Sequence, residues 1–158
     1  MEEVVKTQLR STRVKTVLAA AAALGLTIGV TPTAIAQPKN VAPHVVVMPS
    51  EDLPEVADVT VAISGFEPHA AVFVQQCAQV APGVSGCDFH RTESVDLDDA
   101  GAALTRLSVR RMFEAYNENG DLVGAVDCAQ IKLEPGCFIA VGNVQGGAEA
   151  PLFFKGDE

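Results

Sequence analysis

Short runs of apolar, mostly β-branched residues recur along the chain after residue 43, separated by polar or turn-forming residues. Residues 56–63, 93–97 and 102–109 alternate between apolar and polar positions, which is the period of a half-buried strand. Further apolar runs that predict strands lie at residues 44–48, 71–77, 112–116, 122–128, 138–141 and 152–154. No segment after residue 43 keeps helical periodicity over a useful length, so the pattern predicts about eight or nine short strands.

Turn signals separate these runs about every 8–12 residues, as in an antiparallel sandwich. Asn119-Gly120 predicts a two-residue hairpin of type I′, because both central positions of that turn need a positive φ. We therefore predict an all-β fold, an immunoglobulin-like antiparallel β-sandwich with about seven core strands. The chain contains no tryptophan, so the hallmark core of antibody domains is absent.

The N-terminal region has the order of a secretory signal peptide. Four basic residues come first, namely Lys6, Arg10, Arg13 and Lys15. An apolar run over residues 16–30 and the small-residue site Ala34-Ile35-Ala36 follow. We expect residues 1–36 to be removed, residues 37–43 to be a flexible N-terminal segment, and residues 44–155 to form the secreted domain. An uncleaved membrane anchor is the alternative, and Thr31-Pro32-Thr33 argues against it.

The charge of the chain limits its partners. The net charge is −9, and removal of the leader, with its four basic and two acidic residues, would leave −11. Such a surface repels phosphate backbones and anionic lipids. We therefore expect that the domain does not grip nucleic acid itself and has no stable membrane association after cleavage. We also expect it to be a monomer.

All four cysteines lie in the expected secreted domain, at Cys77, Cys87, Cys128 and Cys137. An even number in a small exported domain indicates disulfides, and three pairings are possible. The spacing favours the two local pairs, each closing a loop that contributes on the order of 2–3 kcal/mol. Zinc is the competing interpretation, but there is no Cys-x-x-Cys pair and the histidines show no ligand spacing, so we expect no metal site.

No catalytic apparatus can be assembled from the sequence. Residues 83–87 look superficially like a nucleophile elbow but lack its Gly-x-Ser-x-Gly spacing. His90 near Asp88 is more typical of a surface histidine in a polar loop. The acidic residues at 96, 98 and 99 could ligate calcium, but they are more typical of the solvated rim of a turn. Arg110-Arg111 is the only basic doublet in the expected domain and is too small for a nucleic-acid patch. We therefore predict a binding protein, not an enzyme.

Several motifs give the chain a family resemblance. They are Gln76-Cys77-Ala78, Gly83-Val84, Cys87, the run from Leu107 to Glu114 with its Val-Arg-Arg-x-Phe-Glu core, Val126-Asp127-Cys128, and more loosely 140–147 and 152–154. In this order and spacing they resemble the neocarzinostatin family over the whole expected domain. The combination of the Val-Arg-Arg-x-Phe-Glu run with both local cysteine pairs is fairly specific.

The resemblance implies a secreted actinobacterial apoprotein with a seven-stranded immunoglobulin-like barrel. Members of the family bind and protect a labile enediyne chromophore, an antibiotic that is released to cleave DNA. The resemblance thus implies that the partner is a hydrophobic small molecule and that the protein acts on DNA only through this ligand. It implies no cofactor other than a non-covalently bound chromophore. The resemblance also implies the pairings Cys77 with Cys87 and Cys128 with Cys137.

The chain departs from the family where aromatic side chains line the ligand cleft. Gln79 stands in place of a tryptophan, Ser85 in place of an apolar residue, Thr92 in place of a phenylalanine and Glu118 in place of an aromatic, while Tyr116 keeps one. Each lost aromatic removes on the order of 1–2 kcal/mol of contact with a stacked ligand. We expect the cleft near Gln79, Ser85, Thr92, Tyr116, Glu118 and Phe138, although core packing is the more usual role for Phe138. The alternative is an extracellular protein-interaction module that has kept the fold and lost the cleft.

Overall fold

The computed structural model describes residues 41–156. The predicted signal peptide and most of the predicted flexible segment lie outside the described residues. The described chain forms ten strands and one short 3₁₀ helix: β1 (His44–Met48), β2 (Val56–Ser64), β3 (Ala71–Ala81), β4 (Val84–Cys87), η1 (Phe89–Arg91), β5 (Glu93–Asp96), β6 (Ala103–Arg110), β7 (Met112–Tyr116), β8 (Leu122–Asp127), β9 (Cys137–Asn143) and β10 (Gly146–Leu152). Between residues 41 and 156 no helix is long and apolar enough to cross a membrane.

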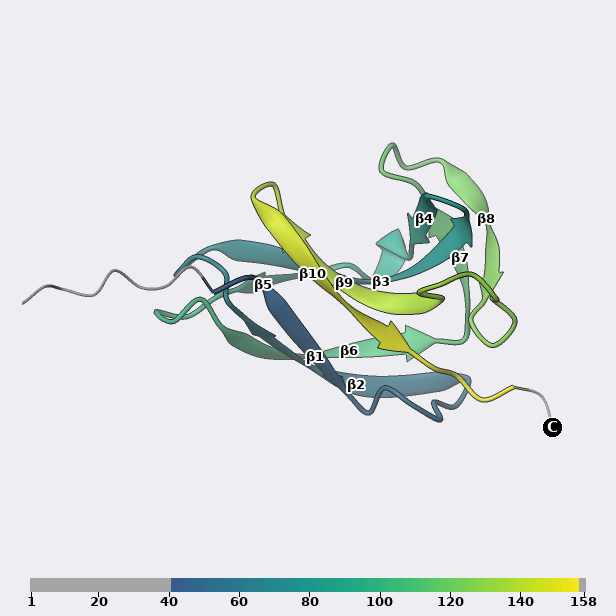
Figure 1. Ribbon diagram of the computed structural model, residues 1–158, viewed down its shortest axis with the longest axis horizontal. Helices are drawn as coiled ribbons and strands as arrows, with labels where there is room; N and C mark the ends of the chain where they lie inside the picture. Colours follow the sequence, from purple (N-terminus) through teal and green to yellow (C-terminus); the bar gives the residue numbers. More distant parts are fainter. Residues whose placement is uncertain (1–40, 157–158) are drawn as a thin grey trace, which may run out of the picture. The chain divides into compact units, whose positions relative to one another are not determined.

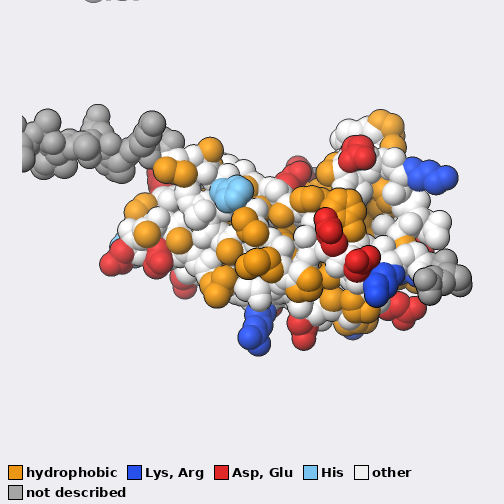
Figure 2. Space-filling view, turned by 60° about the horizontal axis from the view of Figure 1, so that its bottom comes forward, with side chains coloured by type: hydrophobic (Ala, Val, Ile, Leu, Met, Phe, Trp, Pro, Cys, Tyr) orange, Lys and Arg blue, Asp and Glu red, His pale blue; other side chains and the backbone are white. Residues whose placement is uncertain are grey.

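The smaller sheet has three antiparallel strands in the order β1-β2-β6. Alternate residues of β2, namely Val59, Val61 and Ile63, are buried, as the alternation of the sequence predicts. The opposite face is open to solvent and still carries apolar side chains, among them Met48 and Leu104. Figure 2, which brings the lower side of Figure 1 forward, shows apolar side chains gathered over the middle of the visible face.

The larger sheet has seven strands, with β10-β9-β3-β4-β7-β8 in order and β5 paired to β3. The long strand β3 organises it, because β3 pairs antiparallel with β9, β4 and β5. Figure 1 shows β9 and β10 crossing over the smaller sheet, while β4, β7 and β8 lie together at one end of the domain. The main core lies between the sheets and includes Val72, Val74 and Ala78 from one face of β3.

Both local disulfides are confirmed. Cys77 on β3 is bonded to Cys87 on β4, and Cys128, just after β8, is bonded to Cys137 at the start of β9. The all-β sandwich with antiparallel pairing is confirmed as well. Two strands were not predicted, β4 and most of β10, and the run 152–154 contributes only Leu152 to β10 and an isolated bridge from Phe154 to Leu53.

The predicted type I′ turn is wrong. The hairpin between β7 and β8 exists, but only Gly120 has a positive φ, at 83°. Asn117 closes the loop instead, since its Oδ1 accepts hydrogen bonds from the backbone N–H groups of Asn119 at 3.0 Å and Asp121 at 2.9 Å. This side-chain cap stabilises a longer loop in which Asn119 needs no left-handed backbone.

Candidate ligand-binding face and the arginine junction

The strand register places both sulfurs of the first disulfide on one face of the larger sheet. Cys77 lies opposite Cys87 on β4 and opposite Phe138 on β9, and Cys87 lies opposite Tyr116 on β7. Directly opposed residues project to the same side of a sheet, and the neighbouring Ala78 projects to the other side, into the main core. We call the face formed by Cys77, Gln79, Ser85, Cys87, Tyr116 and Phe138 the disulfide face.

Gln79 and Ser85 form a polar pair at one end of the disulfide face. They are direct register partners, and the Ser85 hydroxyl donates to Gln79 Oε1 at 3.4 Å. Gln79 Nε2 also donates to the carbonyl of Ala81 at 2.9 Å. Both polar side chains therefore have partners within the protein, and a ligand that takes their hydrogen bonds must replace these contacts.

An aromatic and acidic cluster surrounds Tyr116. The ring of Phe89, from η1, stacks against it with centroids 6.1 Å apart, and the ring of His90 meets it edge-on at 5.4 Å. The Tyr116 hydroxyl donates to Glu114 Oε2 at 3.0 Å and lies 3.4 Å from His90 Nε2. The hydrogen bond to Glu114 raises the pKa of Tyr116 above its ordinary value, with further contributions from burial and from the charges of Glu114 and Asp88.

The helix η1 is fixed by a buried carboxylate. Asp88 is 2% exposed; its Oδ1 accepts from the His90 backbone N–H at 3.2 Å and its Oδ2 from Arg91 Nη1 at 2.8 Å. The Asp88 backbone N–H donates to the carbonyl of Gln76 on β3. These contacts hold Phe89 and His90 beside the larger sheet in a preformed arrangement.

The six predicted site residues are brought together in part. Gln79, Ser85, Tyr116 and Phe138 share the disulfide face, and Thr92 joins its border through a hydrogen bond to Gln75 Oε1 at 3.1 Å. Glu118 is exposed in the loop that follows β7. Phe138 is only 3% exposed, so its ring serves mainly as packing beneath the face.

Two members of this region were not chosen from the sequence. They are Phe89 and His90, which the sequence predicts only as a surface residue; the contacts of both with Tyr116 depend on the pairing of β4 with β7. The only feature of the sequence that points to Phe89 as a member of this region is its position two residues after Cys87, next to the loop closed by the first disulfide.

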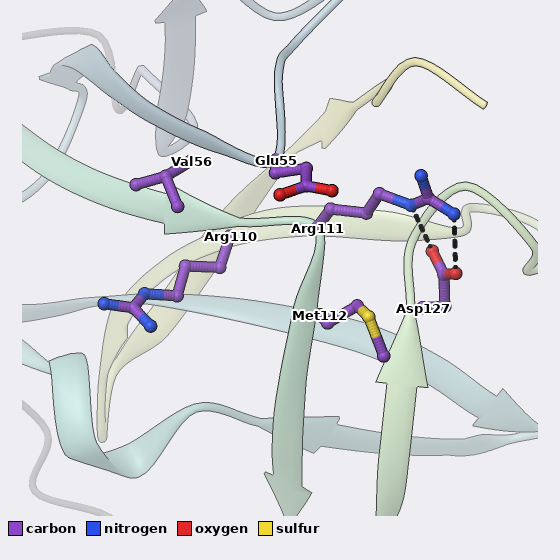
Figure 3. Close-up of a pocket in the computed structure, with 6 residues that line it drawn as sticks. All are labelled: Glu55, Val56, Arg110, Arg111, Met112 and Asp127. Carbon is purple, nitrogen blue, oxygen red and sulfur yellow. Dashed lines mark hydrogen bonds and ion pairs between the residues drawn. The ribbon is translucent and has the colours of Figure 1, made fainter. Parts of the chain in front are cut away.

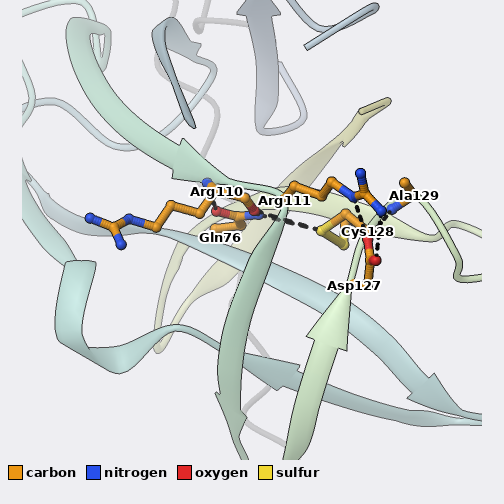
Figure 4. The surroundings of a disulfide bond; sticks show 7 residues. Gln76, Arg110, Arg111, Asp127, Cys128 and Ala129 are labelled. Atoms are coloured by element: carbon orange, nitrogen blue, oxygen red, sulfur yellow. Dashed lines mark hydrogen bonds and ion pairs between the residues drawn. A yellow bond between two sulfur atoms is a disulfide. The ribbon is translucent and has the colours of Figure 1, made fainter. Parts of the chain in front are cut away.

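A second polar cluster, the arginine junction, consists of Gln76, Arg110, Arg111 and Asp127 at the step from β6 to β7 (Figure 4). Gln76 is 1% exposed; its Nε2 donates to the Arg110 carbonyl at 2.6 Å and its Oε1 accepts from the Arg110 N–H at 2.8 Å. Arg111 is 8% exposed and binds both carboxylate oxygens of Asp127, at 2.8 and 2.9 Å.

The pairing with Arg111 has an electrostatic consequence. Hydrogen bonds from Arg111, together with the Ala129 backbone N–H, lower the pKa of Asp127 below its ordinary value, and partial burial opposes the shift. The ion pair is therefore retained to a lower pH than the ordinary pKa of an aspartate would allow. It holds the end of β8 against the turn that carries both arginines, where Cys128 N–H also donates to the Arg111 carbonyl at 2.8 Å.

Within residues 41–156 no three His, Cys, Asp or Glu side chains are grouped so that they could hold a metal ion. The acidic turn considered for calcium is occupied by its own backbone, because Asp98 Oδ1 accepts from the N–H groups of Ala100 at 2.8 Å and Ala102 at 3.0 Å. This is the arrangement expected of a capped turn.

Comparison with known proteins identifies relatives over most of the described domain. A model of the neocarzinostatin family matches residues 45–154. The chain is 35% identical over 113 residues to macromomycin of Streptomyces macromomyceticus, which covers 71% of this chain and 77% of macromomycin. It is 37% identical over 101 residues to apokedarcidin of an actinomycete, covering 63% of this chain and 86% of apokedarcidin.

The comparison extends to a relative named as an apoprotein and to solved structures. The antitumor antibiotic C-1027 apoprotein of Streptomyces globisporus is 31% identical over 102 residues, covering 65% of this chain and 68% of that protein. The structure of macromomycin superimposes with a TM-score of 0.66 at 34% identity, over 72% of this chain and 100% of macromomycin. By sequence and by structure, this chain belongs to the neocarzinostatin family.

Proposed function

We propose that the chain is a secreted, monomeric and non-enzymatic carrier that holds a hydrophobic small molecule against the disulfide face. The ligand is held without a covalent bond and is protected from solvent, and any damage to DNA is done by the ligand and not by the acidic protein. A relative named as the apoprotein of an antitumor antibiotic supports this role.

One observation carries the proposal: the register gathers Gln79, Ser85, Tyr116 and Phe138 around the disulfide that joins β3 to β4. The cross-link and the short pairing of β4 with β7 order this face before a ligand arrives, which lowers the entropic cost of binding. The stacked pair of Phe89 and Tyr116 supplies an aromatic surface, and Glu114 and His90 supply hydrogen-bonding groups at its edge.

The proposed ligand does not depend on stacking against several aromatic side chains of the protein. Gln79 and Ser85 bind each other and Thr92 binds Gln75, so these positions present satisfied polar groups where apolar or aromatic side chains would add contact. Losing the three aromatic rings at positions 79, 92 and 118 weakens a flat aromatic ligand by several powers of ten. We therefore propose a smaller ligand centred on Tyr116 and Phe89.

A second candidate function is an extracellular protein-interaction module. The exposed side chains of Thr92 and Glu118 and the burial of Phe138 favour it, because they leave a flatter and more polar surface than a deep apolar site. Pull-down from an envelope fraction separates the two: a specific protein partner without a bound small molecule selects the interaction module.

The carrier proposal is tested by titrating the purified, isotope-labelled protein with a water-soluble polycyclic aromatic compound and following backbone NMR shifts. We expect the shifts to cluster at residues 77–92 and 114–118. Tyr116→Leu should weaken binding about tenfold because a stacking ring is lost. Phe153→Leu is the matched control, since Phe153 is an exposed aromatic outside the disulfide face, and its affinity should be unchanged.

Two results would contradict the carrier proposal or extend it. Shifts scattered over the surface, with Tyr116→Leu and Phe153→Leu behaving alike, would exclude the disulfide face as the binding site. A natural ligand extracted from the secreted protein and identified by mass would extend the test to the compound itself.

A further inference from the structure

Two pockets of the described domain differ in charge. The pocket at the arginine junction, about 350 Å³ in volume, is lined by Arg110 and Arg111, which Figure 3 shows extending in opposite directions from the same turn. A second pocket of about 700 Å³ lies just before the start of β3, whereas the disulfide face uses Cys77 and Gln79 near the end of that strand. We call it the loop pocket, and none of the described residues that line it is a lysine or an arginine.

Four segments that are distant in the sequence form the loop pocket. They are the segment before β1, the loop between β2 and β3, the turn between β5 and β6, and the turn between β9 and β10. The lining residues that matter for its chemistry are Pro43, Phe66, Glu67, Pro68, Asp99 and Gln145. None of the six residues predicted for the ligand cleft is among them.

The backbone around the loop pocket is closely packed. A Cβ atom at Gly65 would collide with the carbonyl of Ala42, and one at Gly101 would collide with the carbonyl of Phe66. Both glycines have a positive φ, 79° and 68°, and the Phe66 N–H donates to the Gly101 carbonyl at 3.4 Å. The segments are therefore held against one another before a ligand arrives, which lowers the entropic cost of binding.

The two carboxylates that line the loop pocket have long, solvent-exposed contacts. Glu67 Oε2 accepts from Gln145 Nε2 at 3.5 Å, and this contact ties the carboxylate to the turn that forms the other side of the pocket. Asp99 Oδ1 lies 3.4 Å from His69 Nε2, and these two side chains are 97% and 72% exposed. Contacts of this length and exposure exchange readily with water or a ligand. Both carboxylates are therefore available to a cation.

Apolar side chains form the wall beside these carboxylates. Phe66 is half-buried and packs against the main core, so its ring is held in place. Pro43 and Pro68 line the same pocket, and a proline has no side-chain rotamer freedom to lose when a ligand covers it. The loop pocket thus combines a fixed apolar wall with negative charge.

We propose that the loop pocket binds an organic cation with an apolar body, of the class of the arylalkylamines. The ammonium group binds the Glu67 carboxylate in place of the Gln145 amide, because a hydrogen bond between two charged groups is stronger than one from a neutral donor. The aromatic ring packs on Phe66 and the two prolines. Since the ligand carries one charge on a flexible chain, its ammonium and its ring need not meet at one point of the pocket. The negative charge of Asp99 and the net charge of −9 disfavour an anion.

The test is an NMR titration of the purified, isotope-labelled protein with 2-phenylethylamine. We expect shifts at Gly65, Phe66, Glu67 and Gln145 with half-saturation near about 1 mM, as befits so small a ligand. Two analogues each lack one of the two recognised groups: 2-phenylethanol has no charge and ethylamine has no ring. Each should bind at least about tenfold more weakly than the parent amine.

Matched variants separate a specific contact from general attraction to an acidic protein. Glu67→Gln should weaken binding about tenfold. Glu149→Gln removes the same charge but should leave binding unchanged, because Glu149 is exposed on β10 and does not line the loop pocket. Superimposable spectra of the free variants show that both are folded, and the analogues test the wild type independently.

Three results would each overturn the proposal. Equal affinities of the two variants would mean that the amine responds only to the overall negative charge. Equal affinities of 2-phenylethylamine and 2-phenylethanol would exclude recognition of the ammonium group. Shifts confined to the arginine junction or to the disulfide face would exclude the loop pocket as the site. None of these results decides whether the disulfide face holds a polycyclic ligand, so the carrier proposal stands or falls separately.

Discussion

The disulfide face and the arginine junction are both polar regions built on β3, but they use polar groups in different ways. At the junction Gln76 and Arg111 are buried, and they hold the backbone of Arg110 and the carboxylate of Asp127 through hydrogen bonds of 2.6–2.9 Å. On the disulfide face the contacts of Ser85 and His90 are 3.4 Å long and exposed to solvent. Buried hydrogen bonds are expensive to break, whereas exposed ones exchange readily with water or a ligand.

This contrast separates residues that hold the fold from residues that are available for binding. Gln75 and Gln76 illustrate it within one dipeptide, because alternate residues of a strand face opposite sides of the sheet. Gln76 enters the core side and binds Arg110, while Gln75 reaches the disulfide face and accepts from Thr92. Stability should therefore respond strongly to changes at the junction and weakly to changes on the face.

The largest effect is expected from Gln76→Leu. This change leaves the N–H and carbonyl of Arg110 without their partner in a buried place, which should cost about 3 kcal/mol of unfolding free energy. Gln75→Leu is the matched control and should cost less than about 1 kcal/mol, since Gln75 is partly exposed and makes one side-chain contact. Urea denaturation measures both, and similar losses would contradict the contrast.

A somewhat smaller effect is expected from Asp127→Asn, which leaves the buried Arg111 charge without its carboxylate. We expect a loss of about 2 kcal/mol at neutral pH. Asp121→Asn, an exposed aspartate in the β7–β8 loop, should change stability by less than about 0.5 kcal/mol. A neutral result for Asp127→Asn would mean that the ion pair only offsets its own desolvation.

The lowered pKa of Asp127 fixes the direction in which the stability loss of Asp127→Asn changes with pH. Because the pKa of Asp127 is lowered in the folded protein, its contribution is present above the unfolded pKa of about 3.9 and is lost as the pH falls through the lower folded value. The stability difference between the wild type and Asp127→Asn should therefore shrink in strong acid. Denaturation at a series of acidic pH values measures this, and a difference independent of pH would exclude the ion pair as its cause.

On the disulfide face the clearest expected change is spectroscopic. The chain has a single tyrosine, so the ultraviolet absorbance of phenolate reports Tyr116 alone. Its titration midpoint should lie above the ordinary value of about 10 and should fall toward it in Glu114→Gln, which removes the charge of the accepting carboxylate. An unchanged midpoint in Glu114→Gln would show that Glu114 is not the cause of the raised pKa of Tyr116.

The smallest effect is expected from Ser85→Ala. Its hydroxyl makes one long contact at an exposed position, so the unfolding free energy should change by less than about 0.5 kcal/mol. Thermal unfolding of the wild type and the variant measures this. A clear loss of stability would place Ser85 among the residues that hold the fold.

Much of the fold could be predicted because burial on one face leaves a period of two in the sequence. The strands at residues 56–64 and 103–110 carry this pattern and were predicted nearly to their ends. Strand β10 was missed over residues 146–151, which are Gly, Ala, Glu and Pro and have little strand propensity; pairing with β9 makes them a strand. The turn at Asn119-Gly120 was misjudged because the side chain of Asn117 controls it.

The candidate site was less accessible to prediction, for a physical reason. The cysteine spacing predicted the disulfide between Cys77 and Cys87, but only the strand register shows that Tyr116 and Phe138 flank this disulfide. The Arg111–Asp127 pair joins residues on separate strands, and no local pattern predicts which carboxylate a given arginine will meet. Contacts between distant segments follow from sheet pairing, which a single sequence specifies only through the whole fold.

The two disulfides lie on neighbouring register positions, since Cys77 is opposite Phe138 and the adjacent Ala78 is opposite Cys137. Hydrogen-bonded pairing of β3 with β9 therefore joins one cross-link to the other. A protease that cuts within residues 78–86 or 129–136 would divide the chain yet leave both fragments covalently attached. Such a nicked molecule would run as one species until its disulfides are reduced, so a single cut in either loop would not release a fragment.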